Sequence, residues 1–167
     1  MMVKSTVCKK CNKSTKLEFC NGCFLDVIYK RLRKHIRANQ YIKRNDHLLV
    51  KDELTKKIFP SILNTPVTIK FKGKLLPRYK EILTICLDDI EELYLDKLFH
   101  GKSFKMKFSK QQIPLYICLT KEELQRLAKF HKIKLPKRKK TLISEFLDYF
   151  EKQVPGTKFN IKKSILS

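Results

Sequence analysis

The sequence lacks long hydrophobic runs. No apolar stretch approaches the ~20 residues of a membrane-spanning helix, and the amino terminus MMVKSTVCKK lacks the apolar region of a signal peptide. We therefore expect no contact with a membrane and a cytoplasmic location. At 167 residues the chain can bury one substantial core, which predicts one main unit and a small additional module.

Acidic residues are scarce. Only 16 Asp and Glu stand against 38 Lys and Arg, which gives a formal net charge of +22. Four thiolates holding a divalent metal would subtract only about two charges. A positive field of this size favours polyanions such as RNA or DNA. The alternative is that the lysines only make the surface soluble.

Cysteine, by contrast, occurs in a pattern. Two CxxC pairs are separated by eight residues: Cys8, Cys11, Cys20 and Cys23. A reducing cytoplasm disfavours disulfides, whereas two CxxC turns can close a tetrahedral thiolate site. Zinc is the expected metal, and an iron centre or redox-active thiols are the alternatives. Four sulfur ligands leave no position open for water, so we expect a structural rather than catalytic zinc.

A basic helix is expected directly after the second cysteine pair, from about Phe24 to Tyr41. Apolar residues recur there every four positions, which predicts one buried stripe: Phe24, Ile28, Leu32 and Ile36. The other faces carry candidate contacts for RNA phosphates, with a solvated charged face as the alternative: Lys30, Arg31, Arg33, Lys34 and Arg37. The densest basic run is a further candidate RNA contact, or a solvated loop: Lys137, Arg138, Lys139 and Lys140.

The rest of the chain alternates between strand and helix patterns. Strands are expected at 47–50 and 67–71, with another apolar run at 82–86. A first helix is expected to begin at Asp52 or Thr55 and to be interrupted near Pro60, and a second to run from Asp88 or Asp89 to Gly101. A third should follow the capping box formed by Thr120 and Glu123, and a fourth should span 142–150. This alternation predicts the α/β class with a small, mainly parallel sheet.

No group of side chains forms an evident catalytic site. Asp88 and Asp89 are adjacent, and neighbours on a helix diverge by ~100°, so they do not form a facing acid–base pair. Helix capping is the expected role of Asp88. The four histidines are scattered without ligand spacing or a nucleophile partner. Cys86 and Cys118 lie in apolar contexts and are expected to be buried.

Five segments occur in the order found in one protein family. CKKC…FCNGCF with its basic helix resembles the first zinc module of the PP-loop tRNA 2-thiolation proteins, the group of the cytoplasmic wobble-uridine thiolases and their partner subunit. KRNDHLLV is similar to the approach to the family's first strand, and LDDIEELYLDKLFHGK to its LDD helix. IPLYICLTKEEL is similar to a strand followed by a helix with an acidic start, and EFLDYFEKQVPGTKFNIKKSI to the closing helix and PGT-containing strand.

The resemblance implies a domain organisation. A zinc ribbon would occupy residues 1–23, a basic connecting helix 24–45, and a reduced PP-loop domain, of the adenine nucleotide hydrolase-like α/β type, 46–167. The family implies tRNA as a partner.

The family's catalytic motifs are missing from this sequence. In the family, a Ser-Gly-Gly-x-Asp-Ser loop after the first strand lets ATP phosphates approach the backbone. Here VKDELTKK follows, with no glycine between Val50 and Lys72, and Asp52 and Glu53 would repel phosphate. There is no third CxxC that could bind an iron–sulfur cluster. The stretch between Phe71 and Ile82 is shorter than the corresponding segment of the family, and the family's second zinc module is not found. We therefore expect no ATP binding.

These observations predict a shortened, non-catalytic relative of the tRNA thiolases that binds tRNA or scaffolds an active thiolase subunit. Two alternatives stay open. The chain could be a sulfur-transferring enzyme subunit whose active site is completed by a partner chain, with Cys86 or Cys118 as a persulfide carrier. It could also be a zinc-ribbon nucleic-acid-binding protein unrelated to thiolation.

Overall fold

The computed structural model describes residues 6–15, 18–136 and 141–166. Two short antiparallel strands, β1 (Thr6–Val7) and β2 (Ser14–Thr15), precede the long helix α1 (Asn21–Ala38). The elements that follow are β3 (His47–Val50), α2 (Glu53–Ile62), β4 (Thr68–Phe71), β5 (Tyr79–Leu83), α3 (Leu87–Phe99), β6 (Gln112–Pro114), α4 (Lys121–Phe130), α5 (Leu142–Gln153) and α6 (Thr157–Leu166). No helix in the described ranges has both the length and the apolarity to cross a bilayer.

Four strands form one sheet in the order β4-β3-β5-β6, and every pairing in it is parallel. In the centre, Leu48 of β3 pairs with Ile69 on one side and with Lys80 on the other. The chain goes from β3 to β4 at one edge and returns to β5 on the opposite side of β3. Such a reversal of strand order is where parallel sheets bind ligands, outside the carboxyl ends of the strands. The predicted α/β class with a small parallel sheet is confirmed.

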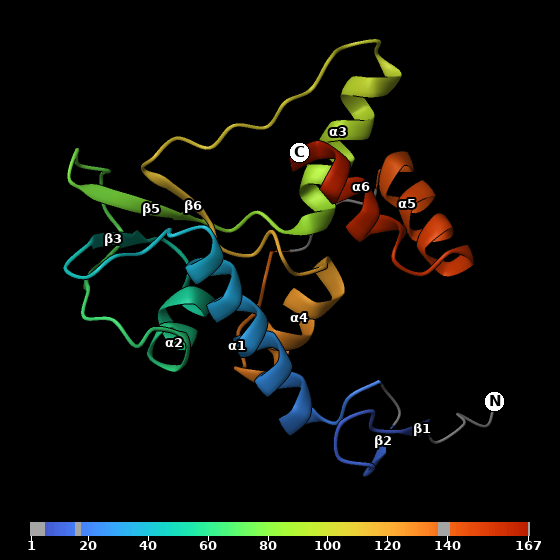
Figure 1. Cartoon of the computed structure of the whole chain (residues 1–167), viewed down its shortest axis with the longest axis horizontal. Coiled ribbons are helices and arrows are strands. Elements are labelled where there is room, and N and C mark those ends of the chain that lie inside the picture. Colours follow the sequence, from blue (N-terminus) through green and yellow to red (C-terminus); the bar gives the residue numbers. More distant parts are fainter. Residues whose placement is uncertain (1–5, 16–17, 137–140, 167) are drawn as a thin grey trace.

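Two hydrophobic cores hold the fold together. The larger one joins α1, α2 and α4 to β3, β5 and β6, and the stripe predicted for α1 faces it: Phe24, Ile28, Leu32 and Ile36. The smaller core joins α3 to α6 around Ile90, Ile117 and Ile165. Figure 1 shows α3, α5 and α6 gathered apart from α1 and α2, with the β1–β2 module at the far end of α1.

Two helix predictions need small corrections. Helix α1 begins at Asn21 and ends at Ala38, three residues earlier at each end than predicted, and the second cysteine pair therefore supplies its N-cap, Cys20, and a residue of its first turn, Cys23. Pro60 does not interrupt α2, which continues to Ile62. Pro60 has no N–H to donate to the Lys56 carbonyl oxygen, but Lys56 and Pro60 are both exposed, so that oxygen can accept from water instead.

Two predicted strands are wrong. The segment LYICL is a series of turns after β6, in which the Leu119 N–H donates to the Tyr116 carbonyl oxygen over 2.9 Å. The PGT segment leads into a helix, α6. The Glu151 carboxylate accepts hydrogen bonds of 2.9 Å from the backbone N–H groups of Gly156 and Lys158, which satisfies donors at the start of α6.

Asp88 caps a helix as expected, but the helix is α4 and not α3, to which Asp88 belongs. Asp89, not Asp88, accepts the hydrogen bond from the Cys86 N–H at the start of α3, over 2.9 Å. Asp88 is buried and instead accepts from the Lys121 N–H at the start of α4, over 2.6 Å. The capping box predicted for α4 is confirmed, because Thr120 and Glu123 each accept from the other's backbone N–H. Cys86 and Cys118 are buried as predicted.

Candidate metal centre and nucleic-acid interface

The four cysteines of the two CxxC pairs converge on one point. Their Sγ atoms all lie within 4.8 Å of one another, and the Sγ atoms of Cys11 and Cys20 are 3.6 Å apart. A tetrahedral zinc site with Zn–S bonds of ~2.3 Å places its sulfurs about 3.8 Å from one another. The side chains therefore fit a single tetrahedral ion, as predicted for Cys8, Cys11, Cys20 and Cys23. The cluster could bind a metal, and the donor set suits zinc or iron.

The local backbone explains how the sulfurs meet. Cys8 and Cys11 lie on a turn between β1 and β2, which is closed by a 3.0 Å hydrogen bond from the Asn12 N–H to the Cys8 carbonyl oxygen. Asn12 has a φ of +57°, a left-handed conformation that asparagine tolerates better than most residues. Cys20 is the N-cap of α1, and Cys23 lies in its first turn. A metal bound here would hold the turn against the amino end of α1.

Without a cation, the pKa values of Cys8 and Cys23 are shifted in opposite directions. The Cys20 N–H donates to the Cys8 sulfur over 3.3 Å and lowers the pKa of Cys8 to about 6. A hydrogen bond with the Cys11 sulfur favours the protonated form of Cys23 and raises its pKa to about 12. Because the two shifts are opposite, the Cys8 and Cys23 thiols do not ionise together. A bound divalent cation removes that restriction, because it stabilises all four thiolates.

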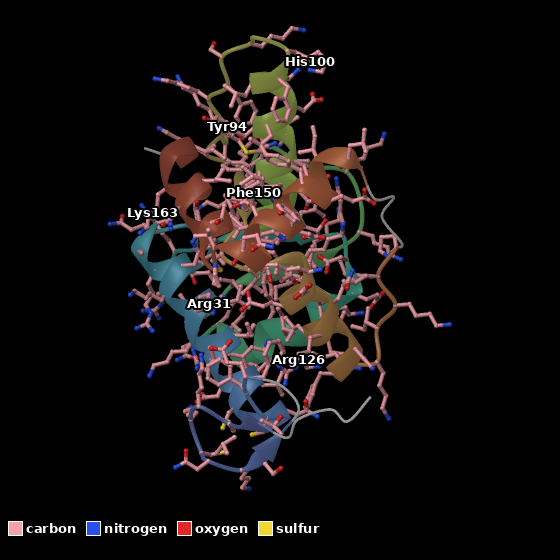
Figure 2. The ribbon with its side chains drawn as sticks, turned by 90° about the vertical axis from the view of Figure 1, so that its right-hand side faces the viewer. Arg31, Tyr94, His100, Arg126, Phe150 and Lys163 are labelled. Atoms are coloured by element: carbon pink, nitrogen blue, oxygen red, sulfur yellow. The ribbon has the colours of Figure 1, made fainter. Side chains whose placement is uncertain are left out.

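Two arginines connect the cysteine module and α1 to α4. Arg126 donates to the Phe19 carbonyl oxygen over 2.7 Å, and its guanidinium carbon lies 4.0 Å from the centre of the Phe24 ring. Arg31 donates to both carboxylate oxygens of Glu123 over 2.7 Å. Figure 2 shows Arg126 on α4 beside the module and Arg31 on α1. Sequence reasoning missed Arg126, whose partners are more than a hundred residues away in the chain.

The basic residues predicted to contact RNA on α1 are not equivalent. Lys30, Lys34 and Arg37 are exposed, and their spacing places them on one stripe opposite the buried stripe. Arg33 is half-buried and donates to the Ser61 carbonyl oxygen over 3.4 Å. Arg31 is paired with Glu123, so its charge is already compensated within the chain. RNA contact by all five stays a prediction. Lys137, Arg138, Lys139 and Lys140 lie outside the described residues.

A cavity of about 170 Å³ lies at the carboxyl ends of β3 and β5, where the strand order reverses. Asp52, Cys86, Tyr116 and Lys121 are among its lining residues. Asp52 caps α2, because its Oδ1 accepts from the Thr55 N–H over 2.7 Å. Its Oδ2 is buried and has no hydrogen-bond partner within the described residues. Burial, and then the negative charge of Asp52, raise the pKa of Tyr116 well above its usual value.

A carboxylate at this point changes what the cavity can bind. Helix amino ends attract phosphates because their N–H groups are unsatisfied and the helix dipole is positive there. In α2 the Asp52 carboxylate already occupies that position, and the turn before it, Val50 to Asp52, contains no glycine. The cavity therefore offers a hydrogen-bond acceptor where a phosphate-binding loop would offer donors.

A buried ionic group near the carboxyl terminus was not predicted. The Lys158 Nζ lies 2.5 Å from Asp88 Oδ1 and 2.7 Å from Asp148 Oδ1. Burial opposes the charge on Lys158, but the two carboxylates outweigh it and raise the pKa of Lys158 above its usual value. The group ties α3, α5 and α6 together, and Asp88 extends it to α4. No local pattern could reveal it, because Asp88 and Lys158 are 70 residues apart in the chain.

Comparison with known proteins supports the fold. No family model matches the sequence, and no curated protein matches it. Among solved structures, the U34-tRNA thiolase NcsA from Methanococcus maripaludis, determined with its 4Fe–4S cluster, matches with a TM-score of 0.70 and 16% identity. The match covers 98% of this chain and 87% of that chain. An identity this low speaks for the fold alone, and the two chains share their overall fold.

Proposed function

We propose that this chain is a non-catalytic component of tRNA wobble-uridine 2-thiolation that binds tRNA or scaffolds an active thiolase subunit. The observation that carries the proposal is the fold match to a U34-tRNA thiolase over 98% of the chain, which includes the four-cysteine module and α1. The net charge of +22 suits the same class of ligand, because phosphate neutralisation supplies most of the affinity for nucleic acids.

Support for a non-catalytic role comes from the cavity at the carboxyl ends of β3 and β5. ATP activation of a uridine needs a loop that lets phosphates approach backbone N–H groups. Here Asp52 caps α2 through its carboxylate, and the segment from Val50 to Lys72 contains no glycine. Negative charge at this position would repel the phosphates. We therefore propose that the chain retains the thiolase fold for binding and not for ATP-dependent chemistry.

The proposed metal is a structural zinc held by Cys8, Cys11, Cys20 and Cys23. When bound, zinc would supply cross-linking of the module rather than Lewis-acid catalysis, since four sulfur ligands close its coordination shell. Residues of the chain itself position the module and present the basic surface. Arg126 fastens the module to α4, and α1 presents Lys30, Lys34 and Arg37 to solvent on the face opposite the core.

Removing the gene from the native host and quantifying 2-thiouridine at position 34 of its tRNAs tests this proposal. We expect the modification to fall sharply and to be restored by the wild-type chain. A K30E/K34E/R37E chain should fail to restore it. A K105E/K107E/K110E chain, which changes the charge equally at exposed residues of the loop before β6, should succeed. A deletion strain with an unchanged 2-thiouridine level would overturn the proposal.

A second candidate function is sulfur transfer, because the Cys86 side chain lines the cavity at the carboxyl ends of β3 and β5. Cys118 is also buried, and its Sγ donates weakly to the Leu115 carbonyl oxygen over 3.8 Å. Under this reading a persulfide on Cys86 would act with a partner chain. Loss of thiolation in a folded Cys86→Ser variant would favour it, and normal thiolation in both Cys86→Ser and Cys118→Ser variants would remove it.

A further inference from the structure

Strand β4 forms an open edge of the parallel sheet. It stands at the end of the strand order and pairs only with β3. The Thr68 N–H donates to the Asp46 carbonyl oxygen and the Lys72 N–H to the Val50 carbonyl oxygen, both over 2.9 Å, so even-numbered residues direct their backbone groups toward β3. Because backbone groups alternate along a strand, the odd-numbered residues direct theirs outward. These residues are Val67, Ile69 and Phe71.

No other described part of the chain pairs with this edge. Among the described residues, none forms a hydrogen bond with the outward backbone groups. The connection to β5 begins with Lys72 and Gly73, whose φ values of +59° and +125° turn the chain out of the strand, and residues 73–78 make no backbone hydrogen bond to β4. Figure 1 shows β3, the neighbour of β4, at the side of the molecule away from α5 and α6. Such an edge can pair with a further strand.

The side chains along the β4 edge alternate between apolar and polar. Val67 and Phe71 pack against the larger core, and Ile69 lies between them on the same face of the sheet. Ile69 is 43% exposed, although its neighbour on β3, Leu48, is fully buried. Thr68 and Lys70 lie on the opposite face and are exposed. A strand added here would therefore find an apolar row on one face and a cation on the other.

Positive charge surrounds the β4 edge without a negative counterpart. Residues 54–80 include seven Lys and Arg and no Asp or Glu. The Nζ atoms of Lys56 and Lys72 lie 4.4 Å and 5.2 Å from the centre of the Phe71 ring. Neither of these lysines nor Lys70 forms an ion pair with a described residue. An acidic occupant would complement this charge.

Charge and backbone chemistry separate the possible occupants. A second copy of this chain, paired through its own β4, would bring two Lys70 side chains onto one face of the joined sheet, and like charges on neighbouring strands are destabilising. Nucleic acid would complement the lysines, but phosphate oxygens only accept hydrogen bonds and would leave the outward carbonyl oxygens unmatched. A peptide strand offers N–H and C=O groups in alternation, which is what the β4 edge requires.

We propose that the β4 edge binds an extended acidic segment of a partner protein, which adds a fifth strand to the four-stranded sheet. Apolar residues of that segment would continue the row of Val67, Ile69 and Phe71, and the Asp or Glu residues between them would lie beside Lys70. Main-chain hydrogen bonds supply the affinity in this mode of binding, and the alternating side chains supply the specificity. The proposal does not rest on the role in tRNA thiolation.

Titration of the full, metal-loaded, RNA-free chain with a blocked peptide of about nine alternating Glu and Val residues tests the proposal. We expect saturable binding by NMR. Hydrogen exchange of the Ile69 and Phe71 amides should slow at least tenfold, whereas that of the Lys70 amide, which already faces β3, should change little. A peptide with Lys in place of Glu should bind at least tenfold more weakly.

Charge reversal on the chain provides the matched comparison. K70E/K72E should bind the Lys peptide more tightly than the Glu peptide, because the charges beside the added strand are exchanged. K105E/K107E changes the net charge equally at exposed residues of the loop before β6 and should keep the preference of the wild type. An unchanged preference in K70E/K72E would overturn the proposal.

Two N-methylated peptides test the backbone pairing. Methyl groups on alternate amides remove the donors of one side of the peptide, so one set should abolish binding and the other should preserve it. Ile69→Pro should also abolish binding without unfolding the chain, because it removes only an outward N–H, whereas Ile69→Thr retains that N–H and should still bind. Equal binding of both methylated peptides would overturn the proposal. So would the absence of binding at about 1 mM peptide, or Lys70-dependent binding of a single-stranded oligonucleotide but not of the peptide.

Discussion

Helices α1 and α5 differ both in the side chains that they bury and in those that they expose. Helix α1 buries an apolar stripe of Phe24, Ile28, Leu32 and Ile36, whereas the buried residues of α5 are Ser144 and Leu147. The 18 residues of α1 carry five Lys and Arg against one acidic residue, whereas the 12 residues of α5 carry one lysine against three acidic residues. The net charge of +22 is therefore unevenly distributed. The positive charge on α1 favours a polyanionic ligand there, whereas the charge on α5 does not.

The largest expected effect comes from removing the metal site. We predict that a Cys8→Ser/Cys11→Ser chain loses the fold of the module and tRNA binding together. The strands β1 and β2 have two residues each, so the module has little apolar burial of its own, and structural zinc supplies ~10–16 kcal/mol of apparent binding free energy. Metal analysis, circular dichroism and tRNA binding measure the outcome.

This change also separates the module from the rest of the fold. The parallel sheet and the contact between α3 and α6 should survive in the Cys8→Ser/Cys11→Ser chain, because neither hydrophobic core contains any of the four cysteines. If the double variant remained fully folded and bound tRNA as the wild type does, the structural role given to the metal would be wrong.

The next largest effect concerns the buried ionic group beneath α5. Lys158→Met should lower the free energy of unfolding by about 3 kcal/mol, because it leaves Asp88 buried without its cation. The pKa of Lys158 is raised, so its contribution is complete below the ordinary lysine pKa of 10.5 and is lost only as the pH rises through the still higher pKa of the folded state.

Urea denaturation at neutral pH measures this prediction. Lys163→Met is the matched control, because Lys163 is an exposed lysine of the same helix, and it should change the free energy by less than about 0.5 kcal/mol. A second variant, Asp88→Asn/Lys158→Met, should be more stable than Lys158→Met alone, since the unpaired charge that remains, on Asp148, is 47% exposed to solvent whereas that of Asp88 is buried. Equal effects of Lys158→Met and Lys163→Met would show that the ionic group does not stabilise the fold.

The smallest effect distinguishes two basic residues on α1 itself. Arg31→Gln should lower the free energy of unfolding by about 1 kcal/mol, because its pair with Glu123 is only partly shielded from solvent, and should leave the salt dependence of tRNA binding unchanged. Lys34→Gln should leave stability unchanged and reduce the slope of log K against log salt concentration by about 0.7–0.9. The opposite result, with Arg31 affecting the slope and Lys34 the stability, would reverse the roles assigned to the two side chains.

Sequence patterns predicted what is encoded locally. The two CxxC pairs, the four-residue spacing of α1 and the capping box of α4 each lie within about twenty residues, and the structure contains all three. Contacts between distant segments could not be predicted in this way. Arg31 pairs with Glu123 and Asp88 with Lys158 across 92 and 70 residues, so neither partner stands out in its own segment. Likewise, α6 was expected as a strand from the resemblance to the family's PGT-containing strand, and the capping of its first turn by Glu151 is not a standard sequence signal that could have corrected this.

The central claim is that the exposed stripe of α1 binds tRNA, and equilibrium binding across a salt series tests it most directly. Metal-loaded wild type, K30E/K34E/R37E and K105E/K107E/K110E would be compared on the same tRNA. Because both variants change the net charge equally, only position distinguishes them. We predict that the α1 variant loses affinity and that its salt slope falls by about 2 to 3, while the loop variant keeps a slope close to that of the wild type. Equal affinities and slopes for the two variants would contradict the account.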